Sequence, residues 1–258
     1  MSDRRISSIS LTIAVVAGAI LAVFLAVFLI FYFKPVASIL IVRWQVRNEP
    51  DLWIVPRPLP APTNESPARK TFSYFGCEFD SPWSEVKQQV NFGPAVRLVF
   101  SGGQVIAILD PARQANALQI FRQGAARRKA NVATVFGKDA TQSNYALRSA
   151  IVNLTPADLR FYISPNKMVD NAVFLLLKPI STTNVKHGFY SFQTNWIRGF
   201  QQGDPARDEM VVIDGFDGQD REIVIVVGVG HGTINRASQA DINRITYSLR
   251  PISASDAK

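Results

Sequence analysis

The sequence predicts an α+β domain that follows a single transmembrane helix, and three observations indicate this. A run of 23 residues near the N-terminus is almost wholly apolar, a Pro-rich stretch follows it, and the remaining chain groups its predicted strands and helices into separate runs. Such segregation, with hairpins as connections, is typical of a mainly antiparallel sheet with helices packed against it. We therefore expect a membrane anchor, a linker and one globular domain.

The composition narrows the class of protein. The chain has 258 residues, of which 47% are hydrophobic, with one Cys and two His. This excludes a disordered chain and a disulfide scaffold, and we expect no metal centre or other cofactor. Residues 71–258 contain 20 basic and 16 acidic residues. The densest basic run, Arg122 with Arg127–Lys129, falls at a predicted helix end, where it complements the helix dipole. We therefore expect no nucleic-acid partner.

After a short tail over residues 1–10, the segment Leu11–Phe33 is predicted to cross the lipid bilayer. It contains no charged residue, and a helix of this length reaches about 35 Å, enough for a hydrocarbon core of about 30 Å. The run is longer than the apolar part of a signal peptide, so we expect a permanent anchor. The flanking Lys and Arg residues do not decide its orientation. A single N-terminal span before a domain is the usual signal-anchor layout, which predicts an extracytoplasmic, periplasmic C-terminal domain.

Small residues recur every four positions within this span, at Ala14, Gly18, Ala22 and Ala26. On a helix they form a stripe that lets two backbones approach, which predicts a helix–helix interface and a homodimer. The alternative is that alanines are simply common in such spans.

Residues 34–70 are predicted to form a juxtamembrane segment and a linker. The apolar run Val36–Val42 is too short to span a bilayer, and with Trp44 and Trp53 it fits an interfacial segment. Six prolines then fall between Pro50 and Pro67. This density favours polyproline II backbone, a semi-rigid spacer that would hold the domain off the membrane.

The globular domain is predicted over residues 71–252, before a tail over residues 253–258. Alternating or apolar runs predict strands, which we place at Thr71–Phe79, Ala95–Phe100, Gln104–Leu109, Gly188–Arg198, Glu209–Asp214 and Arg221–Val227. Helical periodicity and capping residues predict helices, which we place at Pro111–Lys129, at Ser143–Val152, after Thr155, between Ser164 and Pro179, and from Ser238.

Three segments resemble a known family. The strand ending in Phe79–Trp83, the hairpin Val96–Leu109 and the closing helix Ile242–Pro251 are similar to the α-β-α sandwich of PsbP-type extrinsic photosystem proteins and their bacterial lipoprotein relatives. The resemblance covers residues 71–251 and implies a non-enzymatic accessory module. It transfers no ligand residues, and the chain lacks the lipobox Cys of the lipoproteins.

The segment Gly228–Gly232 is the candidate ligand-binding loop. The glycines Gly228, Gly230 and Gly232 would let the backbone approach an anion, and His231 would act as an acid or base near neutral pH. The loop has neither a dinucleotide fingerprint nor a P-loop, and a plain turn before the last helix explains the glycines equally.

Other polar and aromatic clusters have simpler explanations. Asp214, Asp217 and Asp220 lack the spacing of a calcium loop, so a hairpin turn is expected there. Within the aromatic stretch Phe189–Phe200, Tyr190, Phe192 and Trp196 share one strand face. We expect them in the core; if exposed, they would form a patch for a partner.

These observations predict an interaction or accessory module anchored in the membrane, acting with an unidentified envelope protein in envelope assembly or maintenance. No catalytic residue is assigned, because no known catalytic motif occurs. The alternative is an envelope enzyme or a small-ligand-binding protein that uses the Gly228–Gly232 loop.

Overall fold

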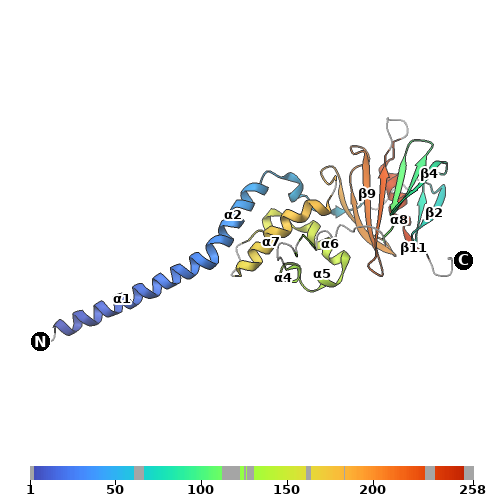
Figure 1. Cartoon of the computed structure of the whole chain (residues 1–258). Coiled ribbons are helices and arrows are strands. Elements are labelled where there is room, and N and C mark those ends of the chain that lie inside the picture. Colours follow the sequence, from blue (N-terminus) through green and yellow to red (C-terminus); the bar gives the residue numbers. More distant parts are fainter. Residues whose placement is uncertain are drawn as a thin grey trace.

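The structure, a computed structural model, describes residues 3–60, 67–111, 123–124, 126, 131–160, 164–182, 184–229 and 236–252. Helix α1 (Asp3–Phe28) runs through a π-helical turn, η1 (Leu29–Phe33), into α2 (Lys34–Val46) and projects from the remaining structure (Figure 1). Among the described residues, one helix, Val16–Val46, is long and apolar enough to cross a membrane, with a mean hydropathy of 2.8. The prediction of an N-terminal helix of that length and composition is confirmed.

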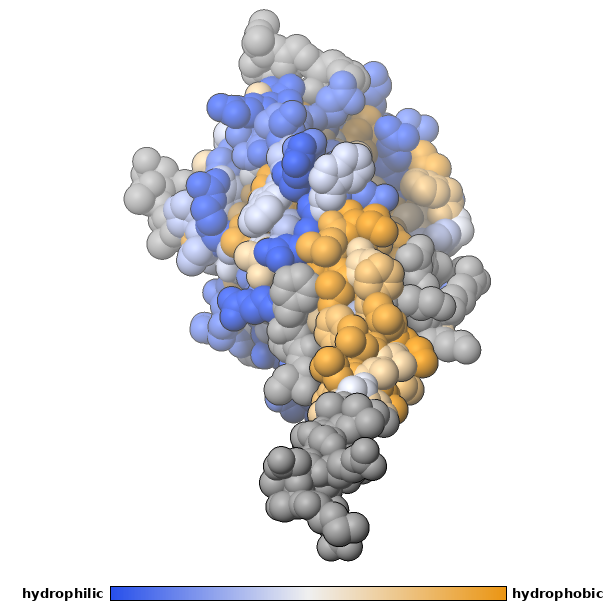
Figure 2. Space-filling model, turned by 90° about the vertical axis from the view of Figure 1, so that its left-hand side faces the viewer, coloured by the Kyte–Doolittle hydropathy of each residue, from blue (hydrophilic) through white to orange (hydrophobic). Residues whose placement is uncertain are grey.

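The helix does not end at Pro35, as the sequence led us to expect. A proline inside an α-helix lacks an N–H group, and its ring clashes with the carbonyl group four residues earlier. Here the widened π-helical turn directly precedes α2, and such turns are places where a long helix accommodates an irregularity. The second apolar run is therefore helical and continuous with the anchor. Its apolar surface continues that of α1, because Leu40, Ile41 and Trp44 are exposed (Figure 2).

An eight-stranded sheet forms the centre of the domain. Its strands, in spatial order, are β1 (Arg57–Pro58), β7 (Phe189–Gln193), β8 (Ile197–Gln202), β9 (Met210–Asp217), β10 (Glu222–Gly228), β6 (Val105–Leu109), β5 (Ala95–Phe100) and β4 (Val86–Phe92). All neighbours are antiparallel except β1 and β7. A smaller sheet has the order β11 (Arg250–Pro251), β3 (Cys77–Ser81) and β2 (Lys70–Tyr74). The predicted α+β class with a mainly antiparallel sheet is confirmed.

The two faces of the large sheet pack against different layers. On one face, Ile213 and Ile225 pack with Ile242 and Ile245 of α8 (Gln239–Ser248) and with the small sheet, a cluster that we call the α8 core. On the other, Phe216 packs with residues of α6 (Asn144–Asn153) and α7 (Pro165–Leu177), which we call the helical core. Side chains alternate between the two faces along each strand. Short helical segments complete the second layer: η2 (Pro50–Trp53), α4 (Val132–Phe136), α5 (Asp139–Gln142), η3 (Pro156–Asp158) and η4 (Lys178–Ser181).

Residues 34–60 differ from the expected free spacer. Ile39, Val42 and Val46 form one stripe of α2 that is buried in the helical core, where α2 packs on α7. Lys178 is buried, and its Nζ donates hydrogen bonds to the carbonyl oxygens of Leu52 at 3.2 Å, Ile54 at 2.9 Å and Leu154 at 2.7 Å. These contacts join the anchor to the domain.

Two predicted strands are hairpins instead. The run Thr71–Phe79 turns at Phe75 and Gly76, which have φ angles of 50° and 80°, so β2 and β3 pair there. The run Gly188–Arg198 turns between Gln193 and Ile197, which separates β7 from β8. When the turn residues continue the alternation of apolar and polar residues, the sequence pattern does not distinguish a hairpin from a single long strand.

The hairpin of β5 and β6 and the helices α6, α7 and α8 lie where the sequence predicts them, and Ser238 caps α8 in a capping box with Asp241. Most of the predicted helix Pro111–Lys129, with its basic run, lies outside the described residues.

Candidate functional site

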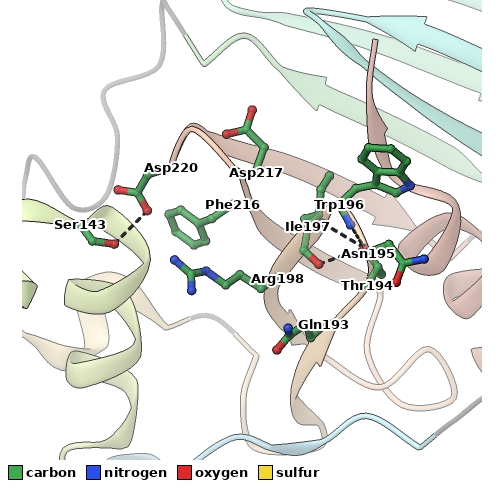
Figure 3. A pocket seen from close by; sticks show the side chains of 11 residues that line it. Ser143, Gln193, Thr194, Asn195, Trp196, Ile197, Arg198, Phe216, Asp217 and Asp220 are labelled. Carbon is green, nitrogen blue, oxygen red and sulfur yellow. Dashed lines mark hydrogen bonds between the residues drawn. The ribbon is translucent and has the colours of Figure 1, made fainter. Parts of the chain in front are cut away.

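A hollow of about 500 Å³ opens where two hairpins of the large sheet meet the N-terminal end of α6 (Figure 3). Its lining comes from Ser143, the segment Gln193–Arg198, Phe216, Asp217, Gly218 and Asp220. A second hollow of about 470 Å³ lies beside it and shares Asn195, Trp196, Asp217 and Gly218 with the first. We call the two hollows together the hairpin-end site.

The turn between β7 and β8 holds Trp196 at this site. The hydroxyl oxygen of Thr194 accepts hydrogen bonds from the backbone N–H groups of Trp196 at 3.1 Å and Ile197 at 3.0 Å, and the hydroxyl group donates to the carbonyl oxygen of Ile197. Such local bonds fix a turn without help from a neighbouring strand. The side chain of Trp196 is 60% exposed. The fixed turn therefore presents a large indole to solvent.

The two acidic residues of the site are engaged within the protein. One carboxylate oxygen of Asp217 accepts hydrogen bonds from the backbone N–H groups of Gln219 and Arg221, and the other pairs with the Arg221 guanidinium at 2.7 Å. The Asp220 carboxylate accepts hydrogen bonds from the Ser143 hydroxyl and from the backbone N–H groups of Asn144 and Tyr145. Asp220 thus caps the first turn of α6 from another element, as a negative charge at a helix N-terminus does.

Arg198 lies against an aromatic cluster on the other side of the hollow. Its guanidinium carbon is 4.0 Å from the centre of the Tyr145 ring, a favourable cation–π distance. Tyr145 in turn stacks on Phe200 and meets Phe216 edge to face, each at 5.8 Å between ring centres. The cluster fixes Tyr145 and so defines where the Arg198 cation lies.

Beneath the site, a buried ion pair joins α6 to the sheet. Arg148 and Asp214 are 2.8 Å apart, with 5% and 3% of their side chains exposed. Burial raises the pKa of Asp214, although the Arg148 charge opposes this shift. Burial, together with the Asp214 charge, raises the pKa of Glu222 to about 8. Glu222 therefore keeps its proton at neutral pH. The Arg148–Asp214 pair positions α6 against the sheet.

The predicted ligand loop is only partly described. Gly228 is the last residue of β10 and pairs with Met210 and Val105. A Cβ atom at this position would lie 3.3 Å from that of Val105, so close packing between strands favours glycine here. Gly230, His231 and Gly232 lie outside the described residues, and their ligand-binding role stays a prediction.

The predicted small-residue stripe lies on α1. Gly18, Ala22 and Ala26 are exposed, and a Cβ atom at Gly18 would meet nothing within 4 Å. The side chain of Ala14 lies outside those described. The stripe contacts no other part of the described chain, and the homodimer stays a prediction.

Sequence reasoning missed the exposure of Trp196. Phe192 is buried in the α8 core and Tyr190 packs against that core, as expected, whereas Trp196 lies on the turn. The signal was the pair Thr194 and Asn195, which are turn residues inside an aromatic run. Asp214, Asp217 and Asp220 do not converge, since each has its own partner. Among the described residues, no group of three or more His, Cys, Asp or Glu side chains could hold a metal ion.

Comparisons of the chain with family models, curated proteins and solved structures find no match. The resemblance to the PsbP-type sandwich stays a prediction, and the function is argued from the site itself.

Proposed function

We propose that the chain is a single-pass membrane protein whose extracytoplasmic domain contacts another envelope component through the hairpin-end site, as an accessory module in envelope assembly or maintenance. The observation that supports this most is the exposed Trp196, held on a hydrogen-bonded turn beside two hollows. Exposed, rigid aromatic side chains are enriched at the centres of binding surfaces.

The chemistry of the site favours binding over catalysis. General acid–base catalysis needs a titratable group within reach of a substrate proton. Among the described residues that line the two hollows, the acids Asp217 and Asp220 are both bonded within the protein, and none of the lining residues is a His or a Cys.

The arrangement of the layers also supports an anchored module. Helices α4, α5, α6 and α7 lie between α1 and the sheet (Figure 1). The packing of α2 on α7 and the three hydrogen bonds of Lys178 join the anchor firmly to this helical layer. A site on the sheet is thereby held at a fixed position beyond the helical layer.

Proximity labelling in native membranes tests this proposal, with the labelling enzyme fused to the C-terminus. We expect a reproducible set of envelope proteins around the wild-type protein. The same set should surround Phe92→Ala, which removes an exposed aromatic on edge strand β4. Around Trp196→Ala, we expect these envelope proteins to be no longer labelled.

Two outcomes would contradict the proposal. Labelling of cytoplasmic proteins alone would overturn the extracytoplasmic orientation. A set of neighbours that Trp196→Ala leaves unchanged would overturn the role of the hairpin-end site.

A further inference from the structure

We infer that the hairpin-end site binds a neutral oligosaccharide. This inference rests on the proposed function and names the chemical class of the ligand at the same site. It follows from three properties of the described lining residues: an exposed aromatic side chain, two carboxylates balanced by two guanidinium groups, and side-chain amides that form no hydrogen bond with another described residue.

The aromatic surface comes from Trp196. One face of a pyranose ring consists of C–H groups, and the face of an indole carries a partial negative charge that attracts them. The indole is 60% exposed, and Thr194 holds its turn in place. Because the turn backbone is already fixed and an indole has only two rotatable bonds, stacking on it costs little conformational entropy.

The charges of the site favour a neutral ligand. Asp217 is paired with Arg221, and Asp220 caps α6. Among the described lining residues, Arg198 is the cation that forms no ion pair with another described residue, and its guanidinium lies over the ring of Tyr145. The two carboxylates and the two guanidinium groups balance, so an anionic ligand would be repelled by Asp217 and Asp220 as much as Arg198 and Arg221 attract it, and the reverse holds for a cation. A ligand with hydroxyl and acetamido groups is uncharged, so it is repelled by neither kind of side chain and does not pay the cost of desolvating a charge.

The amides of Gln193 and Asn195 supply the remaining polar contacts. Both side chains are exposed and form no hydrogen bond with another described residue. An amide donates and accepts hydrogen bonds at once, which suits a hydroxyl or an acetamido group. Asn195 lies next to Trp196 on the turn, so one sugar ring would reach both the indole and this amide, whereas Gln193 at the end of β7 would meet another part of the ligand (Figure 3).

The size of the site favours more than one sugar ring. The two hollows of about 500 and 470 Å³ share Asn195, Trp196, Asp217 and Gly218. At Gly218 a Cβ atom would find nothing within 4 Å, so no side chain occupies the shared wall there. A chain of linked sugar rings would extend from one hollow into the other.

A peptide fits these features less well. Extended peptides add to a free sheet edge or lie in a groove with several aromatic side chains. Here β8, β9 and β10 are each paired on both sides, and the edge strand β11 beside the second hollow has only two residues, one of them a proline. Trp196 is the one exposed large apolar side chain among the described lining residues.

Isothermal titration calorimetry on the full-length protein in nanodiscs tests the inference. The probes are a tetrasaccharide of β-1,4-linked N-acetylglucosamine, an uncharged hexose tetrasaccharide, a sulfated tetrasaccharide and a Pro-rich peptide. We expect at least one neutral tetrasaccharide to bind, and to bind more tightly than the other two probe classes. Trp196→Ala should weaken this binding at least tenfold and the double change Gln193→Ala with Asn195→Ala at least threefold. Phe92→Ala should bind as the wild type does. The thermal unfolding of each variant confirms that it is folded.

Failure of the two proposals is distinguishable. If neither neutral tetrasaccharide binds, or if Trp196→Ala leaves the affinity unchanged, the saccharide inference is overturned. Tighter binding of the sulfated probe or the peptide overturns it as well. In each case, neighbours that still depend on Trp196 in proximity labelling would leave the accessory function standing.

Discussion

The two faces of the large sheet are closed by different kinds of structure. The α8 core joins the strands to α8 and the small sheet, and its interlayer hydrogen bonds include one between the neutral amides of Gln201 and Gln239. The helical core recruits α2 of the anchor, and the same side of the sheet contains the buried charges Arg148, Asp214 and Lys178. Helix α2, which continues the long apolar helix, is therefore part of one core and absent from the other.

Helix α2 is therefore a structural part of the helical layer. It supplies the apolar stripe that the helical layer packs against, whereas the α8 core is closed without it. Substitutions and a deletion on each side would show how independent the two sides are.

Deletion of residues 1–56 should unfold the helical layer selectively. It removes Ile39, Val42, Val46 and Leu52 from the helical core, and burial of each such side chain contributes about 1.5–3 kcal/mol. Hydrogen exchange should show α6 and α7 losing protection while β5, β6, β9 and β10 retain it. Equal loss on both sides would show that the two cores form a single cooperative unit.

Lys178→Met should destabilise the junction between anchor and domain. The change leaves the carbonyl oxygens of Leu52, Ile54 and Leu154 without this donor, and each unsatisfied buried group costs about 1–3 kcal/mol. Burial lowers the pKa of Lys178 to about 8, so removal of the desolvated ammonium offsets part of the loss. We expect a net loss of about 3 kcal/mol in urea unfolding at pH 7. The exposed Lys186→Met serves as the control, and an equally small effect of both changes would contradict the role of Lys178.

Glu222→Gln should change the pH dependence of stability more than stability itself. The folded-state pKa of Glu222 is about 8, above its ordinary value of 4.5. Between these values the folded chain holds a proton that the unfolded chain has released, so wild-type stability falls as the pH rises from about 4.5 to about 8, by at most about 1.4 kcal/mol per pH unit. The neutral Gln lacks this titration, and the decline should shrink. Urea unfolding at pH 5, 6, 7 and 8 measures it, with the exposed Glu85→Gln as control. Identical slopes for Glu222→Gln and wild type would refute the assignment.

Trp196→Ala should have the smallest effect on stability. Its side chain is exposed on the turn, so we expect a change within about 0.5 kcal/mol. Phe192→Ala, on the same hairpin but buried in the α8 core, should cost about 3–5 kcal/mol. Comparable losses for the two variants would mean that Trp196 supports the core.

The α8 side follows simple sequence patterns, which is why its elements could be predicted. The apolar strands around Ile106 and Ile225 alternate or run continuously, and Ser238 with Asp241 marks the start of α8. Where neutral side chains follow a regular pattern, few other assignments of strand or helix fit the sequence.

The helical side and the candidate site could not be predicted in the same way. The buried position of Lys178 depends on three carbonyl groups from two distant segments, and that of Asp214 depends on Arg148 of α6. The exposure of Trp196 depends on a turn inside an aromatic run. Each of these features depends on contacts between distant segments or on the conformation of a turn. A local pattern of apolar and polar residues carries no information about either.

The continuity of the anchor helix with the domain has a mechanical consequence. Between α1 and α2 the helix departs from α geometry at η1 alone among the described residues, and α2 is packed against α7. In a bilayer, the tilt of such a helix follows the thickness of the hydrocarbon core. In a thinner membrane α1 would tilt further from the bilayer normal. The domain would then rotate with it, because η1 (Leu29–Phe33) is the one irregular turn between α1 and the packed α2 among the described residues. The thickness of the lipid would thus set the angle at which the sheet faces its surroundings.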